Sequence, residues 1–326
     1  MNITVLGAGA WGTALAIAFA PRHHVTLLAR DARQATAMQS ARQNARYLPG
    51  CHFPEGLGVS AKSEVLAASD LIVIATPLSG LRDALRLLVR QAPASPFLWV
   101  CKGLEANTGA LPHQVVAETH GAVASGALSG PSFAEEVAHG LPTAITLAAE
   151  DPGFARNTAL ALHGSRLRIY ASDDLIGVEI AGAVKNVLAI ASGISDGLGL
   201  GLNARAALIT RGLAEITRFG VAAGAKRETF MGLAGMGDVI LTCTGDLSRN
   251  RHVGLALAAG HSLQQATKTL GHVAEGINTA REVTRKAKAM SVEMPICDAV
   301  CAVLDGRLRA QDAVDLLMGR DPKSEV

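Results

Sequence analysis

The sequence is poor in aromatic residues and carries no strong excess of charge of either sign. Aromatic side chains make up 3% of its 326 residues, and the formal net charge is +2. A nucleic-acid-binding protein normally has a concentrated basic face or aromatic side chains on which bases stack. Neither feature appears, so we do not expect a nucleic-acid partner.

Cysteine and histidine are present, but without the spacings of a disulfide framework or a metal site. The five cysteines form an odd set with no C-x-x-C pair, and the ten histidines include no H-x-x-x-H pair. These patterns predict reduced thiols, a cytoplasmic protein and no bound metal. Cys297 and Cys301 lie four residues apart on a predicted helix, where we expect core thiols.

Charged side chains are missing from the first 21 residues, which is typical of a signal peptide or a membrane helix. A signal peptide, however, begins with a basic region, and its apolar core is not interrupted by glycines such as Gly7, Gly9 and Gly12. We therefore expect no signal sequence and no membrane span in this stretch.

The same three glycines have the spacing G-x-G-x-x-G between a predicted strand at residues 2–6 and an Ala/Leu-rich helical run. The first glycine permits a sharp turn, the second lets a pyrophosphate approach the backbone, and the third lets the helix pack on the strand. Free N–H groups at the helix N-terminus attract the anion. The pattern predicts a dinucleotide-binding site.

Length and hydrophobic content predict two globular domains with ample core. Short apolar runs are typical of parallel strands buried on both faces, and they predict a Rossmann-type doubly wound α/β domain over residues 1–180. From Asp174 the apolar spacing becomes helical, and we expect a glycine-rich interruption at residues 193–201. Residues 181–326 are therefore predicted to form an all-α C-terminal domain. The predicted strands lie at residues 2–6, 24–29, 71–75, 97–101, 143–147 and 167–170.

Candidate ligand-binding side chains follow predicted strands, because ligands bind at the carboxyl ends of parallel strands. Arg30 follows the second strand, 18 residues after Gly12, where an arginine suits the 2′-phosphate of NADPH. Asp31 is the competing candidate for the ribose, although Gln34 three residues later favours a helix N-cap. Lys102 follows a later strand and is expected to point toward the cofactor crevice; an ordinary surface position is the alternative.

Two polar turns fit either a structural or a binding role. Ser132 and Glu135 have the spacing of a capping box, yet their turn also follows a strand end, where backbone N–H groups can face a ligand. Ser248, Arg249 and Asn250 at a predicted helix start are suited to hold a phosphate. An ordinary solvated turn is the alternative for this tripeptide.

Several motifs in one order resemble bacterial NAD(P)-dependent glycerol-3-phosphate dehydrogenase over nearly the whole chain. The resemblance implies reduction of dihydroxyacetone phosphate to sn-glycerol 3-phosphate by NADPH or NADH, which supplies glycerophospholipid synthesis. It also implies a homodimer. The motifs are GAGAWGTALA at 7–16, LSGPSFA at 128–134, VEIAGAVKNV at 178–187, NARAALITRG at 203–212, GMGD at 235–238, SRN at 248–250 and AEG at 274–276.

The resemblance also implies residue roles, with Lys185 of the Lys-Asn pair as the acid/base. The implied substrate site contains Lys102, Gly130, Ser132, Lys185, Asp238, Ser248, Arg249 and Asn250. The implied cofactor site contains Gly7, Gly9, Ala10, Trp11, Gly12, Arg30, Lys102, Ala134, Arg249, Val273 and Glu275. Because the family often has serine where this chain has Ala10, we expect one hydroxyl contact near the pyrophosphate to be absent.

Lys185 lies in an apolar, small-residue helical segment. Desolvation lowers the pKa of a lysine, which makes proton exchange near neutrality easier. The structural alternative is that Lys185 pairs with an acidic residue such as Asp238 and ties the two domains together. Two rival functions also remain: a hydroxyacid dehydrogenase of the 6-phosphogluconate type, which also uses a helix-borne lysine, and a regulator that binds NADPH without turnover.

Overall fold

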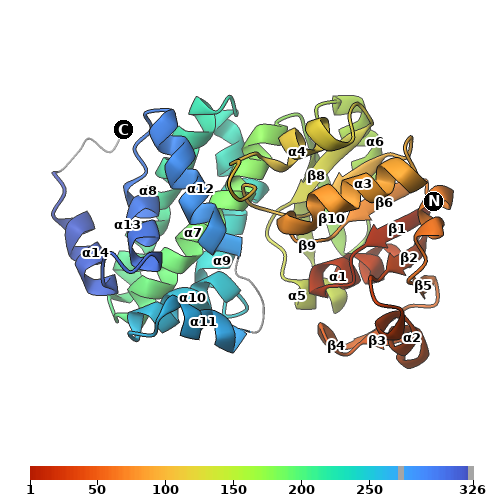
Figure 1. Cartoon of the computed structure of the whole chain (residues 1–326), viewed down its shortest axis with the longest axis horizontal. Helices are drawn as coiled ribbons and strands as arrows, with labels where there is room; N and C mark the ends of the chain where they lie inside the picture. The colour runs from red at the N-terminus through yellow and green to blue at the C-terminus, as the bar shows by residue number, and fades with distance from the viewer. Residues whose placement is uncertain (271–274, 322–326) are drawn as a thin grey trace. The chain divides into compact units, whose positions relative to one another are not determined.

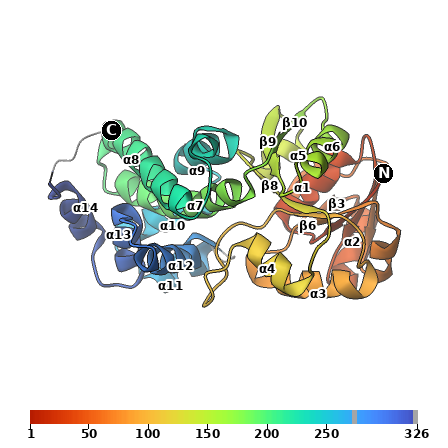
Figure 2. The same cartoon turned by 90° about the horizontal axis from the view of Figure 1, so that it is seen from above.

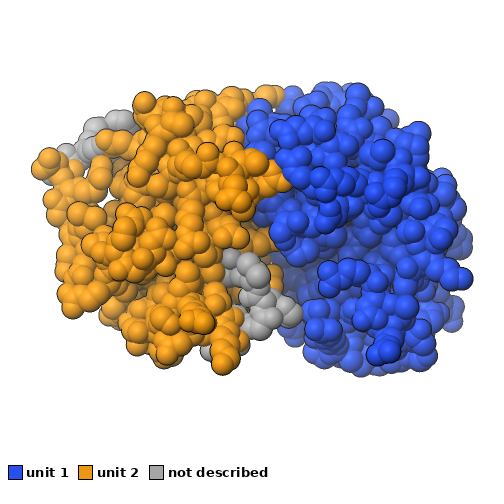
Figure 3. Space-filling model, in the orientation of Figure 1, with its two compact units in different colours: residues 1–102, 110–179 blue, residues 103–109, 180–326 orange. Residues whose placement is uncertain are grey.

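The structure is a computed structural model that describes residues 1–270 and 275–321. The chain divides into two compact units (Figure 3), of which the first comprises Met1–Lys102 and Ala110–Glu179 and the second Gly103–Gly109 and Ile180–Val326. The assignment of cofactor binding to residues 1–180 and substrate binding to residues 181–326 stays a prediction and is taken up under the proposed function.

The first unit is built on one eight-stranded sheet in the order β10-β9-β8-β7-β6-β1-β2-β5 (Figure 1). All neighbouring strands are parallel except β8 and β9. The strands are β1 (Asn2–Leu6), β2 (His24–Leu28), β5 (Leu57–Ser60), β6 (Leu71–Ile74), β7 (Phe97–Trp99), β8 (Ser125–Ser129), β9 (Thr143–Ala148) and β10 (Leu167–Ser172). The central strands are apolar on both faces because helices cover both sides of the sheet.

Helices follow most of these strands as crossover connections. In Figure 2, α3 and α4 lie on one side of the sheet and α1, α5 and α6 on the other. Their bounds are α1 (Ala10–Phe19), α2 (Ala32–Ala41), α3 (Leu81–Gln91), α4 (Pro112–Thr119), α5 (Ala134–Ala138) and α6 (Pro152–Leu162), with 3₁₀ turns at Ser63–Ala68 and Leu78–Gly80. The chain runs from β1 outward to β2 and β5 and then returns to β6 on the other side of β1. In doubly wound sheets, the nucleotide-binding crevice lies at the carboxyl ends of the strands where the strand order reverses in this way, here β1 and β6.

The second unit is helical throughout its described residues, apart from connecting turns. Its helices are α7 (Leu175–Gly197), whose first residues belong to the first unit, α8 (Gly201–Ala222), α9 (Asp238–Thr244), α10 (Arg249–Ala258), α11 (Leu263–Leu270), α12 (Glu275–Ala289), α13 (Pro295–Leu304) and α14 (Ala310–Met318). A 3₁₀ turn at Arg227–Met231 and a π-helical turn at Leu233–Gly237 precede α9. The predicted fold class, a Rossmann-type doubly wound domain followed by an all-α domain, is confirmed.

Helix α7 forms the core of the second unit and continues where the sequence predicted an interruption. Among the described residues it is the helix with the length and composition to cross a membrane, and 94% of its most apolar window is buried inside the protein. Gly193 does not break it. A Cβ at Gly193 would lie 2.0 Å from the Arg251 carbonyl oxygen, so this glycine allows α10 to pack backbone to backbone on α7. The interruption comes later, between Gly197 and Gly201.

The connection after α2 contains short strands. β3 (Gln43–Asn44) pairs antiparallel with β4 (Leu48–His52), and β5 joins the edge of the main sheet. Arg42 stabilises this segment, because its guanidinium donates hydrogen bonds to the carbonyl oxygens of Leu57 at 2.8 Å and Pro54 at 2.5 Å. The strands have no alternating apolar pattern, and Pro49-Gly50 lies inside β4, so periodicity did not predict them.

A buried carboxylate caps α13. Glu215 on α8 accepts hydrogen bonds from the backbone N–H of Ile296 at 2.9 Å and of Cys297 at 3.4 Å. These N–H groups belong to the first turn of α13, which has no intrahelical acceptor for them. Burial nevertheless raises the pKa of Glu215 from 4.5 to about 7, because desolvation outweighs the N–H donors.

The raised pKa of Glu215 makes stability depend on pH. Since the folded state holds the proton more tightly, the contribution to the free energy of unfolding is largest below pH 4.5 and is lost as the pH rises through about 7. Glu215→Gln keeps an acceptor oxygen and cannot titrate. We expect the stability difference between wild type and variant to change by roughly 3 kcal/mol across this range in urea unfolding at a series of pH values. Parallel pH profiles would contradict the assignment.

Candidate functional site

Four of the predicted site positions lie along one edge of the sheet in the first unit. Gly7 directly follows β1, Arg30 lies two residues after β2, Lys102 lies three residues after β7, and Gly130 directly follows β8. Because β1, β2, β6, β7 and β8 are all parallel, their carboxyl ends share this edge. It is the edge at which doubly wound sheets bind nucleotides.

The three positions of the turn after β1 require glycine for different physical reasons. Gly7 has φ +123°, and a Cβ there would lie 2.7 Å from the Ala75 carbonyl oxygen at the end of β6. A Cβ at Gly12 would lie 2.1 Å from the Gly7 carbonyl oxygen. At Gly9, by contrast, no described atom lies within 4 Å of an added Cβ. Packing therefore explains Gly7 and Gly12, whereas the open space at Gly9 fits the approach of a pyrophosphate.

The N-terminus of α1 is suited to bind that anion. Gly9 is its N-cap, and among the described residues no side chain caps the helix, so its first N–H groups, beginning at Ala10 and Trp11, are open to a ligand. Asn44 braces the turn, because its Nδ2 donates to the Ala8 carbonyl oxygen at 3.0 Å and to Thr13 Oγ1 at 2.8 Å. The sequence did not predict this role for Asn44, which lies more than 30 residues away on β3.

Asp31 and Arg30, the two candidates to bind the cofactor ribose or its 2′-phosphate, differ in their hydrogen bonds and exposure. Asp31 is the N-cap of α2 and accepts hydrogen bonds from the backbone N–H of Arg33 at 2.7 Å and of Gln34 at 3.4 Å. The predicted capping role is confirmed. Arg30 is exposed at the carboxyl end of β2. The arginine is thus the side chain of the pair whose position suits a 2′-phosphate.

The turn after β8 does not form the predicted capping box. Phe133 is the N-cap of α5, and Ser132 Oγ instead donates to the Gly130 carbonyl oxygen at 2.9 Å. The hydroxyl is used within the turn, and Glu135 is exposed. Gly130 has φ +140°, and a Cβ there would lie 2.9 Å from Ile145 Cα on β9. Ala134 is the first residue of α5 and is half-buried, as is Lys102.

In the second unit, the predicted acid/base lies in a buried polar cluster. Lys185 on α7 is 8% exposed, and its Nζ donates to Asp238 Oδ1 at 2.5 Å and to Thr242 Oγ1 at 3.0 Å. Asp238 begins α9 and is 0% exposed. The ion pair of the structural alternative is therefore present. Both partners belong to the second unit, however, so the pair does not tie the two units together.

Thr242 is a member of this cluster that sequence reasoning missed. It lies one turn after Asp238 on α9, and its Oγ1 donates to the Asp238 carbonyl oxygen at 2.6 Å while accepting from Lys185 Nζ. The i, i+4 spacing of two polar residues on one short helix was the available signal. The cluster holds the lysine amino group at one position.

A second polar cluster joins α7, α10 and α12. Asn250 Nδ2 donates to Asn186 Oδ1 at 3.0 Å, and Asn250 Oδ1 accepts from the Gly276 backbone N–H at 3.2 Å. A Cβ at Gly276 would lie 2.7 Å from that same oxygen, so the start of α12 requires glycine here. The neighbouring Glu275 is half-buried, whereas Val273 lies outside the described residues. The cluster brings Asn250 beside the Lys185-Asn186 pair.

The Ser-Arg-Asn turn is the start of α10. Ser248 is buried and caps the helix by accepting a hydrogen bond from the Arg251 backbone N–H at 3.3 Å. Arg249 is exposed, and in the described part of the chain its guanidinium makes no hydrogen bond or ion pair. An exposed guanidinium in the first turn of a helix can bind a phosphate together with the helix N–H groups. No group of three His, Cys, Asp or Glu among the described residues could hold a metal ion.

Comparison with known proteins agrees with this arrangement. Residues 2–155 match the family model for the NAD-dependent glycerol-3-phosphate dehydrogenase N-terminus, and residues 174–315 match that for its C-terminus. The chain belongs to this family. It is 63% identical to the glycerol-3-phosphate dehydrogenase [NAD(P)+] of Dechloromonas aromatica and 59% identical to that of Aromatoleum aromaticum, in each case over 100% of both chains.

Solved structures of glycerol-3-phosphate dehydrogenases have the same fold. The crystal structure of the enzyme from Coxiella burnetii superposes with a TM-score of 0.93 at 43% identity, covering 98% of this chain and 99% of the other. Both the α/β unit and the helical unit of this chain therefore have counterparts in a solved glycerol-3-phosphate dehydrogenase.

The different reasons for Gly9 and Gly12 lead to a prediction. A methyl group at Gly9 meets no protein atom but occupies the space for the pyrophosphate, so Gly9→Ala should keep the melting temperature and weaken NADPH binding by ~10-fold or more. Gly12→Ala should instead destabilise the fold by about 1–3 kcal/mol, because its Cβ overlaps the Gly7 carbonyl. Thermal denaturation and NADPH titration of both variants measure this. Unchanged NADPH affinity in Gly9→Ala would show that the pyrophosphate does not bind at this turn.

Proposed function

We propose that this protein catalyses the reversible NAD(P)H-dependent reduction of dihydroxyacetone phosphate to sn-glycerol 3-phosphate, which supplies glycerophospholipid synthesis. The observation that carries the proposal is the buried cluster of Lys185, Asp238 and Thr242, held next to the Asn186 and Asn250 contact in a member of the glycerol-3-phosphate dehydrogenase family.

Cofactor binding is proposed for residues 1–180. The glycine turn and the N-terminus of α1 fit a pyrophosphate, and Arg30 at the end of β2 fits a 2′-phosphate, so NADPH is the favoured cofactor and NADH the alternative. The bound nicotinamide supplies the hydride. The proposed cofactor residues are Gly7, Gly9, Ala10, Trp11, Gly12, Arg30, Lys102, Ala134, Arg249, Val273 and Glu275.

Substrate binding is proposed for residues 181–326, with contributions from Lys102, Gly130 and Ser132. Arg249 holds the substrate phosphate together with the α10 N-terminus and Asn250, and this remote binding energy orients the carbonyl. Lys185 then gives its proton to the oxygen of that carbonyl as hydride reaches the carbon, and it takes the proton back in the reverse reaction. Asp238 and Thr242 fix the amino group at the reacting position.

Localisation and assembly are also proposed. All five cysteines are buried free thiols, which supports a reducing cytoplasm. A homodimer is proposed from the family resemblance. Light scattering on the purified 33.6 kDa chain tests the dimer, and a monomeric mass at working concentrations would reject it.

The proposed reaction is tested by NADPH oxidation with dihydroxyacetone phosphate. We expect rapid oxidation with this substrate and far slower oxidation with unphosphorylated dihydroxyacetone, because the phosphate supplies orienting energy. Turnover of hydroxyacids instead would favour a dehydrogenase of the 6-phosphogluconate type. Tight NADPH binding without any substrate-dependent oxidation would favour a cofactor-sensing regulator.

A prediction about Lys185 must account for its buried partner. Lys185→Met alone leaves the Asp238 carboxylate buried without its partner lysine, which costs about 3–5 kcal/mol in other proteins. The double variant Lys185→Met, Asp238→Asn removes both charges and should fold more readily. If Lys185 is the acid/base, the double variant keeps NADPH affinity while kcat falls ~10²–10⁴-fold. A folded double variant with nearly wild-type kcat would show that the ion pair is only structural.

A prediction about Arg30 addresses the choice of cofactor. Arg30→Ala should weaken NADPH binding by roughly 1–3 kcal/mol, because a charge-assisted hydrogen bond to the 2′-phosphate is lost. NADH lacks that phosphate and should bind unchanged. Titration of the variant with both cofactors measures the difference, and equal weakening of the two would show that Arg30 does not contact the 2′-phosphate.

A further inference from the structure

Beyond the lysine cluster, α7 carries another charged side chain, the largely buried Asp196, and one of its partners, Arg251, lies next to the substrate turn. Asp196 is eleven residues after Lys185, which is three turns of helix, so the two side chains differ in direction by only ~20°. Ser192, on the same face, donates to the Cys243 carbonyl oxygen at 2.7 Å. One face of α7 therefore contacts both α9 and α10 through polar groups.

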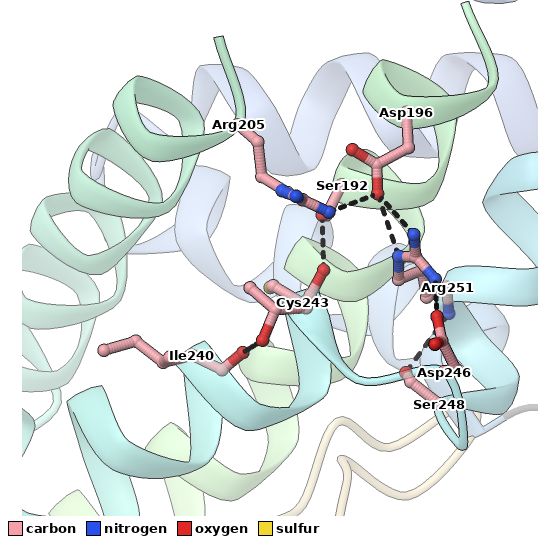
Figure 4. Close-up of polar contacts among 9 residues, drawn as sticks. Ser192, Asp196, Arg205, Ile240, Cys243, Asp246, Ser248 and Arg251 are labelled. Carbon is pink, nitrogen blue, oxygen red and sulfur yellow. Dashed lines mark hydrogen bonds and ion pairs between the residues drawn. The ribbon is translucent and has the colours of Figure 1, made fainter. Parts of the chain in front are cut away.

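Asp196 binds two arginines (Figure 4). Its Oδ2 accepts from Arg251 Nε at 2.9 Å and lies 2.8 Å from Arg251 Nη2, so two N–H groups of the guanidinium fork converge on one carboxylate oxygen. Arg205, near the start of α8, donates to the same oxygen at 3.0 Å. The side chains of Arg251 and Asp196 are 12% and 14% exposed. Because two N–H groups of one planar guanidinium meet the same largely buried oxygen, the contact restrains the direction of the Arg251 side chain as well as its distance from Asp196.

Arg251 also contacts Asp246, but in a different environment. Its Nη1 donates to Asp246 Oδ1 at 3.0 Å, and the Asp246 side chain is 94% exposed. An exposed ion pair contributes little to stability, whereas loss of a buried partner leaves an uncompensated charge. The Asp196 contact is therefore the one that restrains the start of α10.

The backbone at the same place leaves α10 little freedom to shift. A Cβ at Gly193 would lie 2.0 Å from the Arg251 carbonyl oxygen, and one at Gly254 would lie 2.1 Å from the Ile190 carbonyl oxygen. Arg251 follows directly after Arg249 and Asn250, which bear the proposed phosphate contact. The Asp196 contact adds a side-chain restraint on Arg251 to this backbone packing, and the two neighbours belong to the same turn of α10.

We propose that the Asp196–Arg251 ion pair is a positioning device for the substrate phosphate: it fixes the first turn of α10 on α7, so that Arg249 and Asn250 lie at a set distance from Lys185. This inference rests on the proposed function. Neither Asp196 nor Arg251 touches the substrate; both act through Arg249 and Asn250. Because a displacement of about 1 Å in a positioned group can cost ~10²-fold in rate, the pair matters for turnover as well as for stability.

Asp196→Asn tests the proposal, since it keeps the side-chain shape and removes the charge. At saturating NADPH, we expect kcat/KM for dihydroxyacetone phosphate to fall ~10–100-fold and the inhibition constant of inorganic phosphate to rise. The kcat/KM for unphosphorylated dihydroxyacetone should change by less than about three-fold, because that substrate has no phosphate to be held. Asp246→Asn is the matched control, because it makes the same change in the other, exposed carboxylate partner of Arg251. We expect it to leave both kcat/KM values and the inhibition constant of phosphate unchanged.

Equal falls for both substrates, or no change with dihydroxyacetone phosphate, would overturn the proposal. If Asp196→Asn does not fold, Arg251→Lys keeps the charge but loses the fork, and the ratio of the two kcat/KM values should fall at least about three-fold; an unchanged ratio overturns the proposal. A wild type that does not oxidise NADPH with dihydroxyacetone phosphate would refute the proposed function itself. An active wild type with an unchanged ratio in the variant would refute only the positioning role.

Discussion

The second unit depends on the burial of charge along a helix that is otherwise apolar. Lys185 and Asp196 both lie on α7, in surroundings where an unpaired ion costs several kcal/mol. Each is compensated by a residue from a different helix: Asp238 begins α9, and Arg251 lies in the first turn of α10. The need to neutralise these charges therefore fixes where α9 and α10 lie on α7, and the helix starts that result carry the proposed substrate contacts.

In the first unit the proposed ligand contacts come mainly from backbone N–H groups, whereas in the second unit they come mainly from side chains. The N-terminus of α1 has no side-chain cap, and Gly9 leaves open space beside it. Two other helices of the same unit begin with a capping carboxylate, Asp31 at α2 and Asp151 at α6. An uncapped helix start that is braced from behind by Asn44 retains N–H donors and a positive dipole end for an anionic ligand. The turn is thus suited to bind an anion because no side chain of the turn takes up the hydrogen-bonding capacity of these backbone N–H groups.

The sequence predicted the elements whose physics is local. Parallel strands covered on both faces must be apolar throughout, so β1, β6 and β9 were found within one or two residues of their bounds. β3 and β4 were missed, because they have no alternating apolar pattern and β4 contains Pro49-Gly50. Gly193 was interpreted as a helix break, since a glycine that permits close approach of a second backbone and one that ends a helix are identical in sequence.

For the candidate site, too, residues within a local motif could be predicted from the sequence, whereas residues brought in from distant elements could not. The motif around Lys185 was recognisable, but Thr242 and Asn44 became visible only when distant elements came together. The arginines of the α10 motif show why. Arg249 and Arg251 are two residues apart and chemically identical, yet their directions differ by about 200° around the helix axis. Arg249 is exposed, whereas Arg251 contacts the largely buried Asp196 carboxylate through two N–H groups. Their roles therefore follow from the helix face and could not be assigned from the motif.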